Sequence, residues 1–355
     1  MTVADSPQRT RWTPRIGATL GLIAFVSFAS IVASQSVACA RAPEGNHATH
    51  VRLAIGGQNQ MVYLPTTLAQ ELGFYREEGL DIELQDFQGG AKALQALVGG
   101  SADVVSGFYD HTIQMAAEGR EFVAFVTMLR FPGLVLVTSP QSAVTKIEDL
   151  KGRIAGVTTA GSSSQMLLTY MLQRHGVAAD EVSITAIGSA ATAIAAIEHG
   201  RVDAGMMADP SFTLVQRRNP TVRVLADLRS AAGVKEAFGT SAYPASVLYA
   251  KGEWVRANHD TARHLARAIL RTLQWMQSHS AEEITMKTPP SLRGEDDALY
   301  TEALNSSMPM FSPDGLMAAD GADIVRTLLA GSLEKVHAAT IDVSKTYTNG
   351  FVNGR

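Results

Sequence analysis

The chain has 355 residues, a length that is enough for about two domains of ~150 residues. Of these residues 46% are hydrophobic and 18% charged, a composition that excludes a disordered protein. Its 30 basic and 34 acidic residues give a net charge of −4, so it lacks the basic excess typical of nucleic-acid-binding proteins. Cys39 is the single cysteine, which excludes an intrachain disulfide framework and a thiolate zinc site.

The N-terminal segment has the pattern of a secretory signal peptide. Three arginines between residues 9 and 15 precede a stretch at 16–40 without charged side chains, and the centre of this stretch, at 20–33, is strongly apolar. Small residues follow at 36–40, where a signal peptidase would cleave. We therefore expect a signal peptide at 1–39, a linker at 40–50 and a periplasmic protein.

Two alternatives exist for this segment. The uncharged stretch could form a single transmembrane anchor, because ~20 apolar residues suffice to span a bilayer. Cys39 directly follows Ser36-Val37-Ala38 and is a candidate lipidation site, although a lipoprotein signal usually has Leu where this chain has Ser36. Plain cleavage is favoured over both alternatives.

Downstream of residue 50, strand patterns alternate with helix patterns. The first group has strands expected at 51–55, 80–87, 102–106, 122–129 and 134–138, with helices at 64–72, 89–100 and 112–119. The second group has strands expected at 154–158, 182–187 and 202–207, with helices at 162–175 and 190–199. Strands separated by helices of this length favour βαβ units and mostly parallel sheets, an α/β fold.

The two groups resemble each other locally. Residues 93–97, followed by Gly100 and Asp103, recur as residues 193–197, followed by Gly200 and Asp203. In each copy a helix ends at a glycine, and an aspartate then leads into a short strand. This repeat predicts two similar α/β lobes.

The pattern changes after residue 243. One more strand is expected at 246–250, followed by helices at 261–278, 295–305 and 319–329 that we expect to pack on the first lobe. The expected organisation is lobe 1 at 51–139, lobe 2 at 140–242 and a return to lobe 1 at 243–355.

The turns that follow the strands point to a binding site. In open α/β sheets, ligands bind outside the carboxyl ends of the strands. Most of these turns carry glycine or hydrogen-bonding side chains. The aromatic residue Tyr243 directly follows the second lobe and could provide a stacking surface. The candidate ligand-binding residues are Gln58, Asn59, Gln60, Tyr63, Gly89, Gly90, Tyr109, Asp110, His111, Arg130, Gly161, Ser162, Ser163, Ser164, Asp209 and Tyr243.

Each of the more specific candidates has a structural alternative. The turn at 161–164 could bind an anion through backbone N–H groups and serine hydroxyls, or it could simply cap a helix. Arg130 could neutralise an anion with a forked pair of bonds or lie on the surface. Asp110 and His111 could contact a ligand or orient their loop, and Asp209 could contact a ligand or start a helix.

Catalytic signatures are missing from the sequence. It contains no Gly-x-Ser-x-Gly elbow, no His-Glu-x-x-His, no P-loop and no Gly-x-Gly-x-x-Gly after a strand, and its nine His residues are not spaced as metal ligands. We expect no enzyme activity, no cofactor and no metal.

Six segments together resemble the nitrate/sulfonate/taurine family of periplasmic substrate-binding proteins. They are residues 64–83 (LPTTLAQELGFYREEGLDIE), 89–97, 102–104, 146–157 (KIEDLKGRIAGV), 161–162 and 200–204, in an order that covers about 50–215. The resemblance implies the type II periplasmic-binding-protein fold, with two lobes joined by crossover strands and a ligand cleft between them. It also implies pocket turns at 58–63, 89–90, 109–111, 161–164 and 209.

The resemblance implies a solute-binding protein that delivers its ligand to an ABC permease and its ATPase. We expect a monomer that binds a small organic anion, such as a sulfonate, a nitrate- or taurine-like ion or an aromatic acid, with no nucleic-acid partner. Its membrane contact would be through the permease or a lipid anchor. One alternative is a neutral heterocycle such as a thiamine-precursor pyrimidine, stacked on aromatic residues (Tyr63, Phe108, Tyr109 and Tyr243). Others are an enzyme of the related thiamine-pyrimidine synthase branch and a sensory module.

Overall fold

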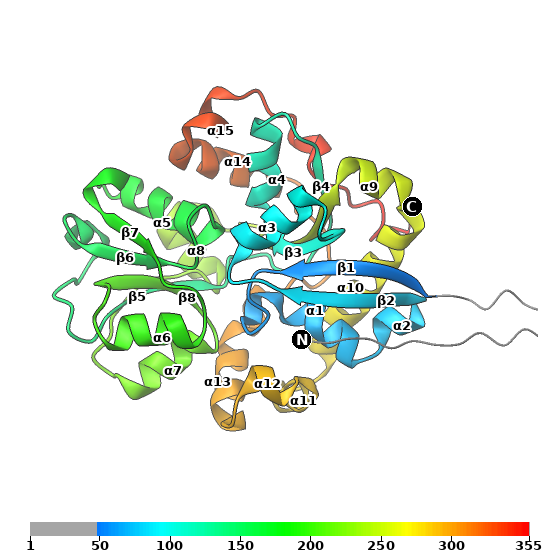
Figure 1. Cartoon of the computed structure of the whole chain (residues 1–355). Coiled ribbons are helices and arrows are strands. Elements are labelled where there is room, and N and C mark those ends of the chain that lie inside the picture. Colours follow the sequence, from blue (N-terminus) through cyan, green and yellow to red (C-terminus); the bar gives the residue numbers. More distant parts are fainter. Residues whose placement is uncertain (1–47, 355) are drawn as a thin grey trace, which may run out of the picture. The chain divides into compact units, whose positions relative to one another are not determined.

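Two five-stranded sheets form the framework of residues 48–354, the part of the chain that the computed structural model describes (Figure 1). The first sheet has the order β2 (Leu80–Asp86), β1 (Thr49–Ile55), β3 (Val104–Phe108), β10 (Ser246–Lys251) and β4 (Phe122–Thr127). The second has the order β7 (Ser183–Ala186), β6 (Ile154–Val157), β8 (Ala204–Ala208), β5 (Leu134–Thr138) and β9 (Val224–Asp227). The expected signal peptide, Cys39 and most of the expected linker lie outside the described residues.

The two sheets share one topology. In the first, β1 pairs in parallel with β2 and β3, whereas β10 runs antiparallel to β3 and β4. In the second, β6 pairs in parallel with β7 and β8, whereas β5 runs antiparallel to β8 and β9. The predicted two-lobed α/β fold is confirmed. In each sheet one strand, β10 in the first and β5 in the second, is antiparallel to both of its neighbours.

Two details of the expected boundaries differ from the structure. Strand β5, assigned to the first lobe from its position in the sequence, belongs to the second sheet, so the crossover lies before Leu134. A buried apolar run shows that a strand exists but not which sheet it joins. Thr49 and His50, expected in the linker, are the first residues of β1.

The repeat at 93–103 and 193–203 has a structural counterpart. Helices α3 (Gly90–Gly99) and α6 (Ala191–Glu198) lead into β3 and β8, which occupy equivalent places in the two sheets. Asp103 accepts the Arg52 backbone N–H at 3.0 Å, and Asp203 accepts the Ile154 backbone N–H at 2.9 Å. Each aspartate thus joins the start of its strand to the neighbouring strand.

Helices cover both sheets. In the first lobe they are α1 (Leu64–Glu71), α2 (Phe74–Glu77) and α4 (Asp110–Ala117), and in the second α5 (Ser163–Arg174), α7 (Ser211–Arg218) and α8 (Ala231–Phe238). Gly73, where a helix end was predicted, follows the last residue of α1 and its C-cap Leu72, and adopts a φ of 78°, a conformation that favours glycine.

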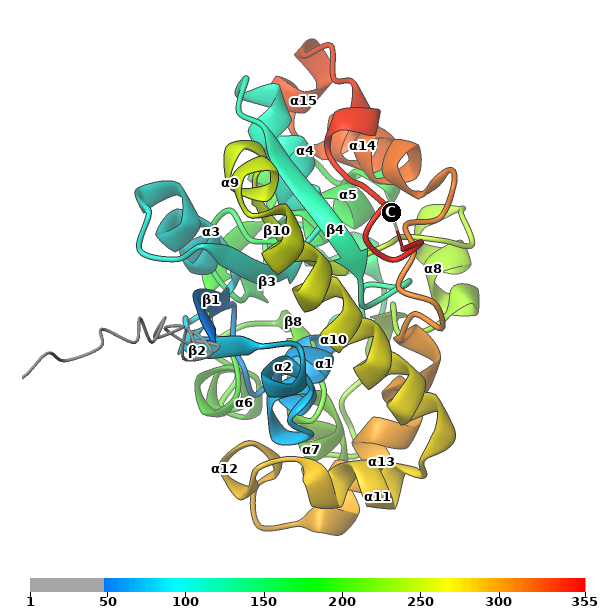
Figure 2. The ribbon, with the colours of Figure 1, turned by 90° about the vertical axis from the view of Figure 1, so that its right-hand side faces the viewer.

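The C-terminal segment begins with α9 (Gly252–Ala257) and the long α10 (His259–Ser278). Leu265, Ile269, Leu273 and Met276 recur at helical spacing on the buried face of α10, which packs on α1, α2 and β4 (Figure 2). The remaining helices are α11 (Ala281–Lys287), α12 (Pro290–Arg293), α13 (Asp297–Ser307), α14 (Gly321–Ser332) and α15 (Glu334–Ala338).

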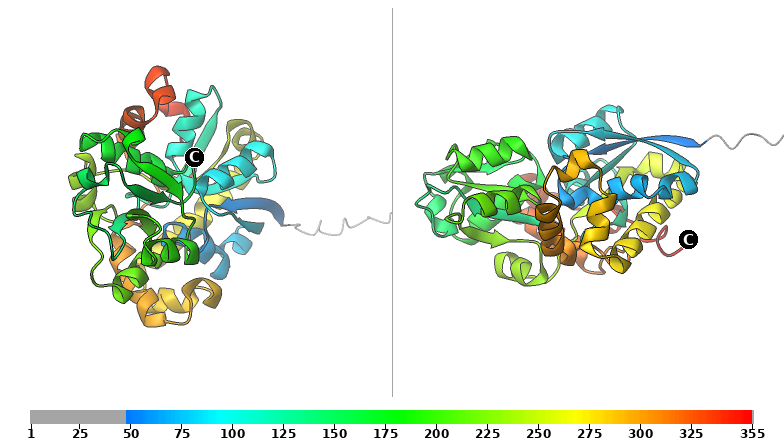
Figure 3. Two further views of the ribbon diagram at one scale, coloured as in Figure 1. Left: turned by 60° about the vertical axis from the view of Figure 1, so that its left-hand side comes forward. Right: turned by 90° about the horizontal axis from the view of Figure 1, so that it is seen from below.

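The C-terminal helices also reach the second lobe, which the sequence did not predict. Helix α13 contacts α7, and α14 contacts α5 as well as α4 of the first lobe (Figure 3). None of the helices in residues 48–354 is long and apolar enough to cross a membrane.

Two segments of the described chain, 128–133 and 240–245, connect the lobes and lie side by side. The Ala245 N–H donates to the Leu129 carbonyl at 2.9 Å, and the Tyr243 N–H donates to the Arg130 carbonyl at 3.2 Å. The Arg130 N–H donates to the Met310 carbonyl at 2.9 Å, which adds a third segment. These bonds hold the connections between the lobes together, and the bonded segments are called the hinge below.

The Asp103 interaction gives the first testable prediction. Asp103→Ala removes the acceptor for the Arg52 backbone and an ion pair of 2.7 Å with its guanidinium. Hydrogen bonds to a charged group contribute about 1.5–3 kcal/mol, so we expect the free energy of unfolding in urea to fall by about 2 kcal/mol. As a control, Asp260→Ala removes an exposed pair with Arg263 and should change stability by less than about 1 kcal/mol. Equal effects of the two substitutions would contradict the assignment.

Candidate functional site

A cavity of about 20 Å³ lies between the two lobes. From the first lobe it is lined by Gly56, Gln60, Val62, Tyr63, Gly90 and Phe108, and from the second by Leu134, Thr158, Ser162, Ser163 and Ser164. Most of these residues follow the carboxyl ends of β1, β2 and β6, and Phe108 is the last residue of β3, as expected for a ligand site in this type of sheet. Since one water needs ~10–15 Å³ of such volume, a larger solute requires the lobes to separate.

The first-lobe wall depends on two touching backbone segments. A Cβ atom at Gly56 would lie 2.6 Å from both the N and the Cα atoms of Gly90, so the end of β1 lies against the start of α3. The Gln60 amide donates to the Gly56 carbonyl at 2.9 Å and holds this turn. Tyr63 and Phe108 pack edge to face, with ring centroids 6.2 Å apart, and form the aromatic part of the wall.

Glycine is also required where the lobes meet. Gly89 has a φ of 111°, and a Cβ atom there would lie 2.7 Å from the Thr159 hydroxyl of the second lobe. The pair Gly89-Gly90 therefore serves two close approaches, one within its own lobe and one across the cavity.

The second-lobe wall is the start of α5. The hydroxyls of Ser162, Ser164 and Thr158 bond to one another at 2.8–3.0 Å, and Ser164 also accepts the Thr158 backbone N–H at 3.0 Å. Ser162 precedes the helix but makes no side-chain capping bond. The serines thus form a buried hydroxyl cluster that keeps the helix start close to β6.

Asp110 links the two walls. This first residue of α4 is fully buried, and its carboxylate accepts bonds from the hydroxyls of Ser163, at 2.7 Å, and Tyr243, at 3.4 Å. Burial raises the pKa of the Asp110 carboxyl, whereas the neighbouring His111 and the two hydroxyls act to lower it. The Asp110–Ser163 bond joins α4 of the first lobe to α5 of the second.

His111 lies behind Gly90. Its Nδ1 is 3.2 Å from the Tyr249 hydroxyl, its Nε2 is buried without a hydrogen bond of good geometry, and a Cβ atom at Gly90 would lie 3.1 Å from its ring. Burial lowers the pKa of His111, with the Asp110 charge opposing, which favours a neutral imidazole. The described residues hold no group of three or more His, Cys, Asp or Glu side chains that could bind a metal.

Comparison with known proteins identifies this architecture. Residues 60–283 match the family described as NMT1/THI5 like. The chain belongs to the NMT1/THI5-like family.

Individual relatives span most of this NMT1/THI5-like chain. YtlA of Bacillus subtilis (strain 168), named as a candidate binding protein, is 23% identical over 288 residues, covering 78% of this chain and 82% of YtlA. A solved structure from Bordetella bronchiseptica RB50 is 38% identical, with a TM-score of 0.83 and coverage of 87% and 97%. The alkanesulfonate-binding protein SsuA from Xanthomonas axonopodis pv. citri, solved with MOPS bound, is 18% identical, with a TM-score of 0.68 and coverage of 84% and 98%, and shows the same fold.

The candidates from the sequence fall into distinct groups in the NMT1/THI5-like structure. Gln60, Tyr63, Gly90 and Ser162 to Ser164 line the cavity, and Asp110, His111, Tyr243 and Gly89 lie directly behind or beside it.

Other candidates from the sequence lie away from this cavity. Gln58 bonds to Thr67, the Tyr109 hydroxyl bonds to Thr346, and Gly161 is exposed at the turn before α5. Asn59 lines a separate cavity of about 610 Å³ that α6, α7, α12 and α13 border.

The side chains of Arg130 and Asp209 are hydrogen-bonded to other parts of the protein and do not line the cavity. Arg130 lies in the hinge, and its exposed side chain donates to the Pro309 carbonyl at 3.1 Å. Asp209 is buried, and its carboxylate bonds to Arg229 at 2.9 Å and to the Ser307 hydroxyl of α13 at 2.8 Å. Its carbonyl accepts the Met61 N–H at 2.9 Å, so Asp209 joins the two lobes.

Some cavity residues were missed by the sequence analysis. Gly56 directly follows the expected strand end at 55, and its position alone could have identified it. Thr158 was expected to be the last residue of a strand, whereas β6 ends at Val157 and leaves Thr158 in the turn. Val62 and Leu134 gave no such signal, because apolar residues of this kind occur throughout the core.

The glycine contact in the first-lobe wall leads to a testable prediction. Gly56→Ala places a methyl group against the Gly90 backbone, which cannot rotate away, so we expect the free energy of unfolding to fall by about 1–3 kcal/mol. Gly99→Ala is the matched control, because no atom lies within 4 Å of the added methyl group. Urea unfolding of both variants is the measurement, and a Gly56→Ala variant as stable as the control would contradict the close approach.

Proposed function

We propose that this protein is the extracytoplasmic solute-binding component of an ABC importer, which captures a small organic solute between its lobes. The observation that supports this most strongly is the cavity itself, which takes its lining from the turns of both lobes. A solute in contact with both walls is enclosed when the lobes close about the hinge. The solute-binding relatives and the signal-peptide pattern agree with this role.

The sequence favoured a small organic anion as the solute. The N-terminal end of α5 offers backbone N–H groups and a positive dipole end, which support that choice. The Asp110 carboxylate beside the same helix end opposes it. A neutral heterocycle is the alternative ligand, supported by the aromatic wall of Tyr63 and Phe108. The other alternative is an enzyme of the thiamine-pyrimidine synthase branch. Turnover of a bound pyrimidine by the pure protein would support this enzyme over a binding protein.

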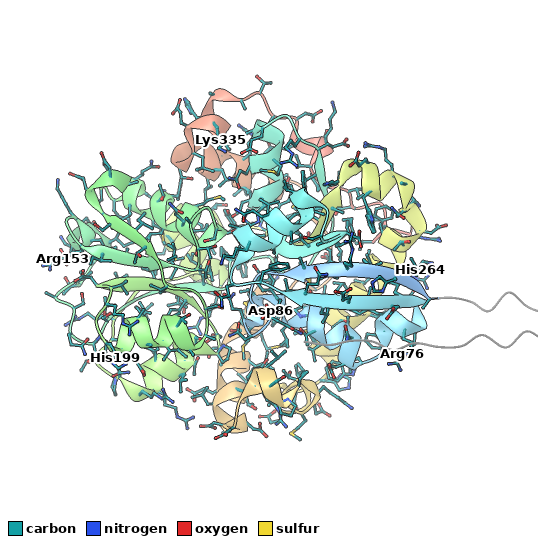
Figure 4. All side chains as sticks on the ribbon, viewed as in Figure 1. Arg76, Asp86, Arg153, His199, His264 and Lys335 are labelled. Atoms are coloured by element: carbon teal, nitrogen blue, oxygen red, sulfur yellow. The ribbon has the colours of Figure 1, made fainter. Side chains whose placement is uncertain are left out.

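A thermal-shift screen tests the proposed function. We expect one class among sulfonates, nitrate, taurine, aromatic acids and pyrimidines to stabilise the protein, by about 2.7 kcal/mol at 100 times its Kd. Tyr63→Ala, which removes part of the wall, should abolish this shift relative to its own baseline. Arg153→Ala, at the far end of the second lobe (Figure 4), should leave it unchanged. Failure of every class would contradict the proposal.

We also propose that the protein is exported and that its leader is removed. The intact mass of the protein purified from its native host measures the outcome. We expect a bare chain that begins near Cys39 or Arg41. Cleavage after Ala38 with a lipid adduct would assign Cys39 as an anchor, and an uncleaved chain would contradict export with processing.

A further inference from the structure

The carboxylate of Asp110 is buried between the lobes without a Lys or Arg partner in the described residues. The imidazole of the neighbouring His111 acts on this carboxylate, but burial lowers the pKa of the imidazole and favours its neutral form. Its hydrogen bonds come from the hydroxyls of Ser163 and Tyr243, and its side chain is 0% exposed. A buried carboxylate is normally paired with a cation, because desolvation disfavours the ionised form. This site therefore has an uncompensated preference for positive charge or for further hydrogen-bond donors.

The surroundings do not supply that charge. The cavity-lining residues that the structure describes include no Lys, Arg or His. Arg229 is already bonded to both Asp209 and Asp227, and Arg130 is exposed at the hinge. A second carboxylate, Asp86, lies at the end of β2, where it accepts the Gln58 N–H (Figure 4). The charges that border the cavity are thus mainly negative.

The helix start that could bind an anion already faces a carboxylate. Ser163 is the first residue of α5, and its hydroxyl points to Asp110 rather than into free space. An anionic solute at this position would approach Asp110 across a single hydroxyl group. Like charges at such a distance repel strongly in a dry site.

Two further polar atoms beside the cavity are also unsatisfied. His111 Nε2 is buried, makes no hydrogen bond of good geometry and lies behind Gly90, which lines the cavity. Burial lowers the pKa of this imidazole, whereas the Asp110 charge and the nearby Gly161 backbone act to raise it. The Thr159 hydroxyl is likewise buried without a partner, next to Gly89. Buried polar atoms are almost always hydrogen-bonded in native proteins, so these two point to a polar ligand.

We propose that Asp110 selects a solute that presents a cationic or hydrogen-bond-donating nitrogen group, of the amine or amidine type, and disfavours anions. This inference rests on the proposed solute-binding function and names the class of solute. The nitrogen group of the solute donates charge-assisted hydrogen bonds to the carboxylate of Asp110, while the planar or apolar part of the solute lies against Tyr63 and Phe108. His111 and Thr159 provide the remaining polar contacts.

Pairs of probes with the same shape and opposite charge test this selectivity. Benzamidine and benzoate form one pair, guanidinium and nitrate the other, and binding is measured by thermal shift and ligand-observed NMR at constant ionic strength. We expect benzamidine to bind at least tenfold more tightly than benzoate, and guanidinium more tightly than nitrate. This comparison uses the wild-type protein and does not depend on any variant.

Asp110→Asn then tests the residue. The amide keeps an acceptor oxygen for Ser163 and removes the charge, so we expect benzamidine to bind at least tenfold more weakly. Asp81→Asn is the matched control, because Asp81 is exposed near the opposite end of β2, and it should bind benzamidine like the wild type.

The outcomes separate the two proposals. Tighter binding of benzoate or nitrate, or equal benzamidine affinity in Asp110→Asn, overturns the inference and leaves solute binding intact. Absence of binding by all four probes also overturns the inference. The proposed function itself fails only when the wider thermal-shift screen finds no ligand.

Discussion

Hydrogen bonds between the two crossover segments constrain the rest of the structure. Residues 128–133 and 240–245 pair with each other, and 309–312 joins them, so the lobes are held together along one line. With this line fixed, the carboxyl ends of the parallel strands in both sheets face a common space. Asp110 and Ser163, 53 positions apart in sequence, meet there at 2.7 Å. The hinge thereby determines which turns can form a site.

Much of the fold follows from local patterns in the chain. Alternating strands and helices, glycine stops such as Gly73 and Gly100, and the repeat ending in Asp103 and Asp203 were sufficient to predict two similar lobes. Sheet membership was not predictable in the same way. Strand β5 is apolar on both faces and would suit either sheet, and only its pairing with β8 and β9 assigns it.

The site was predictable as a set of turns but not as a set of contacts. Rules about strand ends located Gly90 and Ser162 to Ser164 correctly beside the cavity. They could not show that the serine hydroxyls bond to one another or that Ser163 turns toward Asp110. Arg130 illustrates the same limit, because its place after a strand is correct while its side chain follows the hinge to the Pro309 carbonyl. Such choices depend on partners distant in sequence.

The contact between α14 and α5 bears on how readily the lobes can separate. Gly331 lies on the ring of Tyr170, where a Cβ atom would be 3.3 Å from the ring, and the same helix contacts α4. Separating the lobes at this edge uncovers the tyrosine, so the packing favours the closed arrangement by an amount proportional to the apolar area involved. A pre-existing bias of 1.4 kcal/mol changes apparent affinity about tenfold. In the proposed solute-binding role, α14 would therefore influence affinity from outside the cavity.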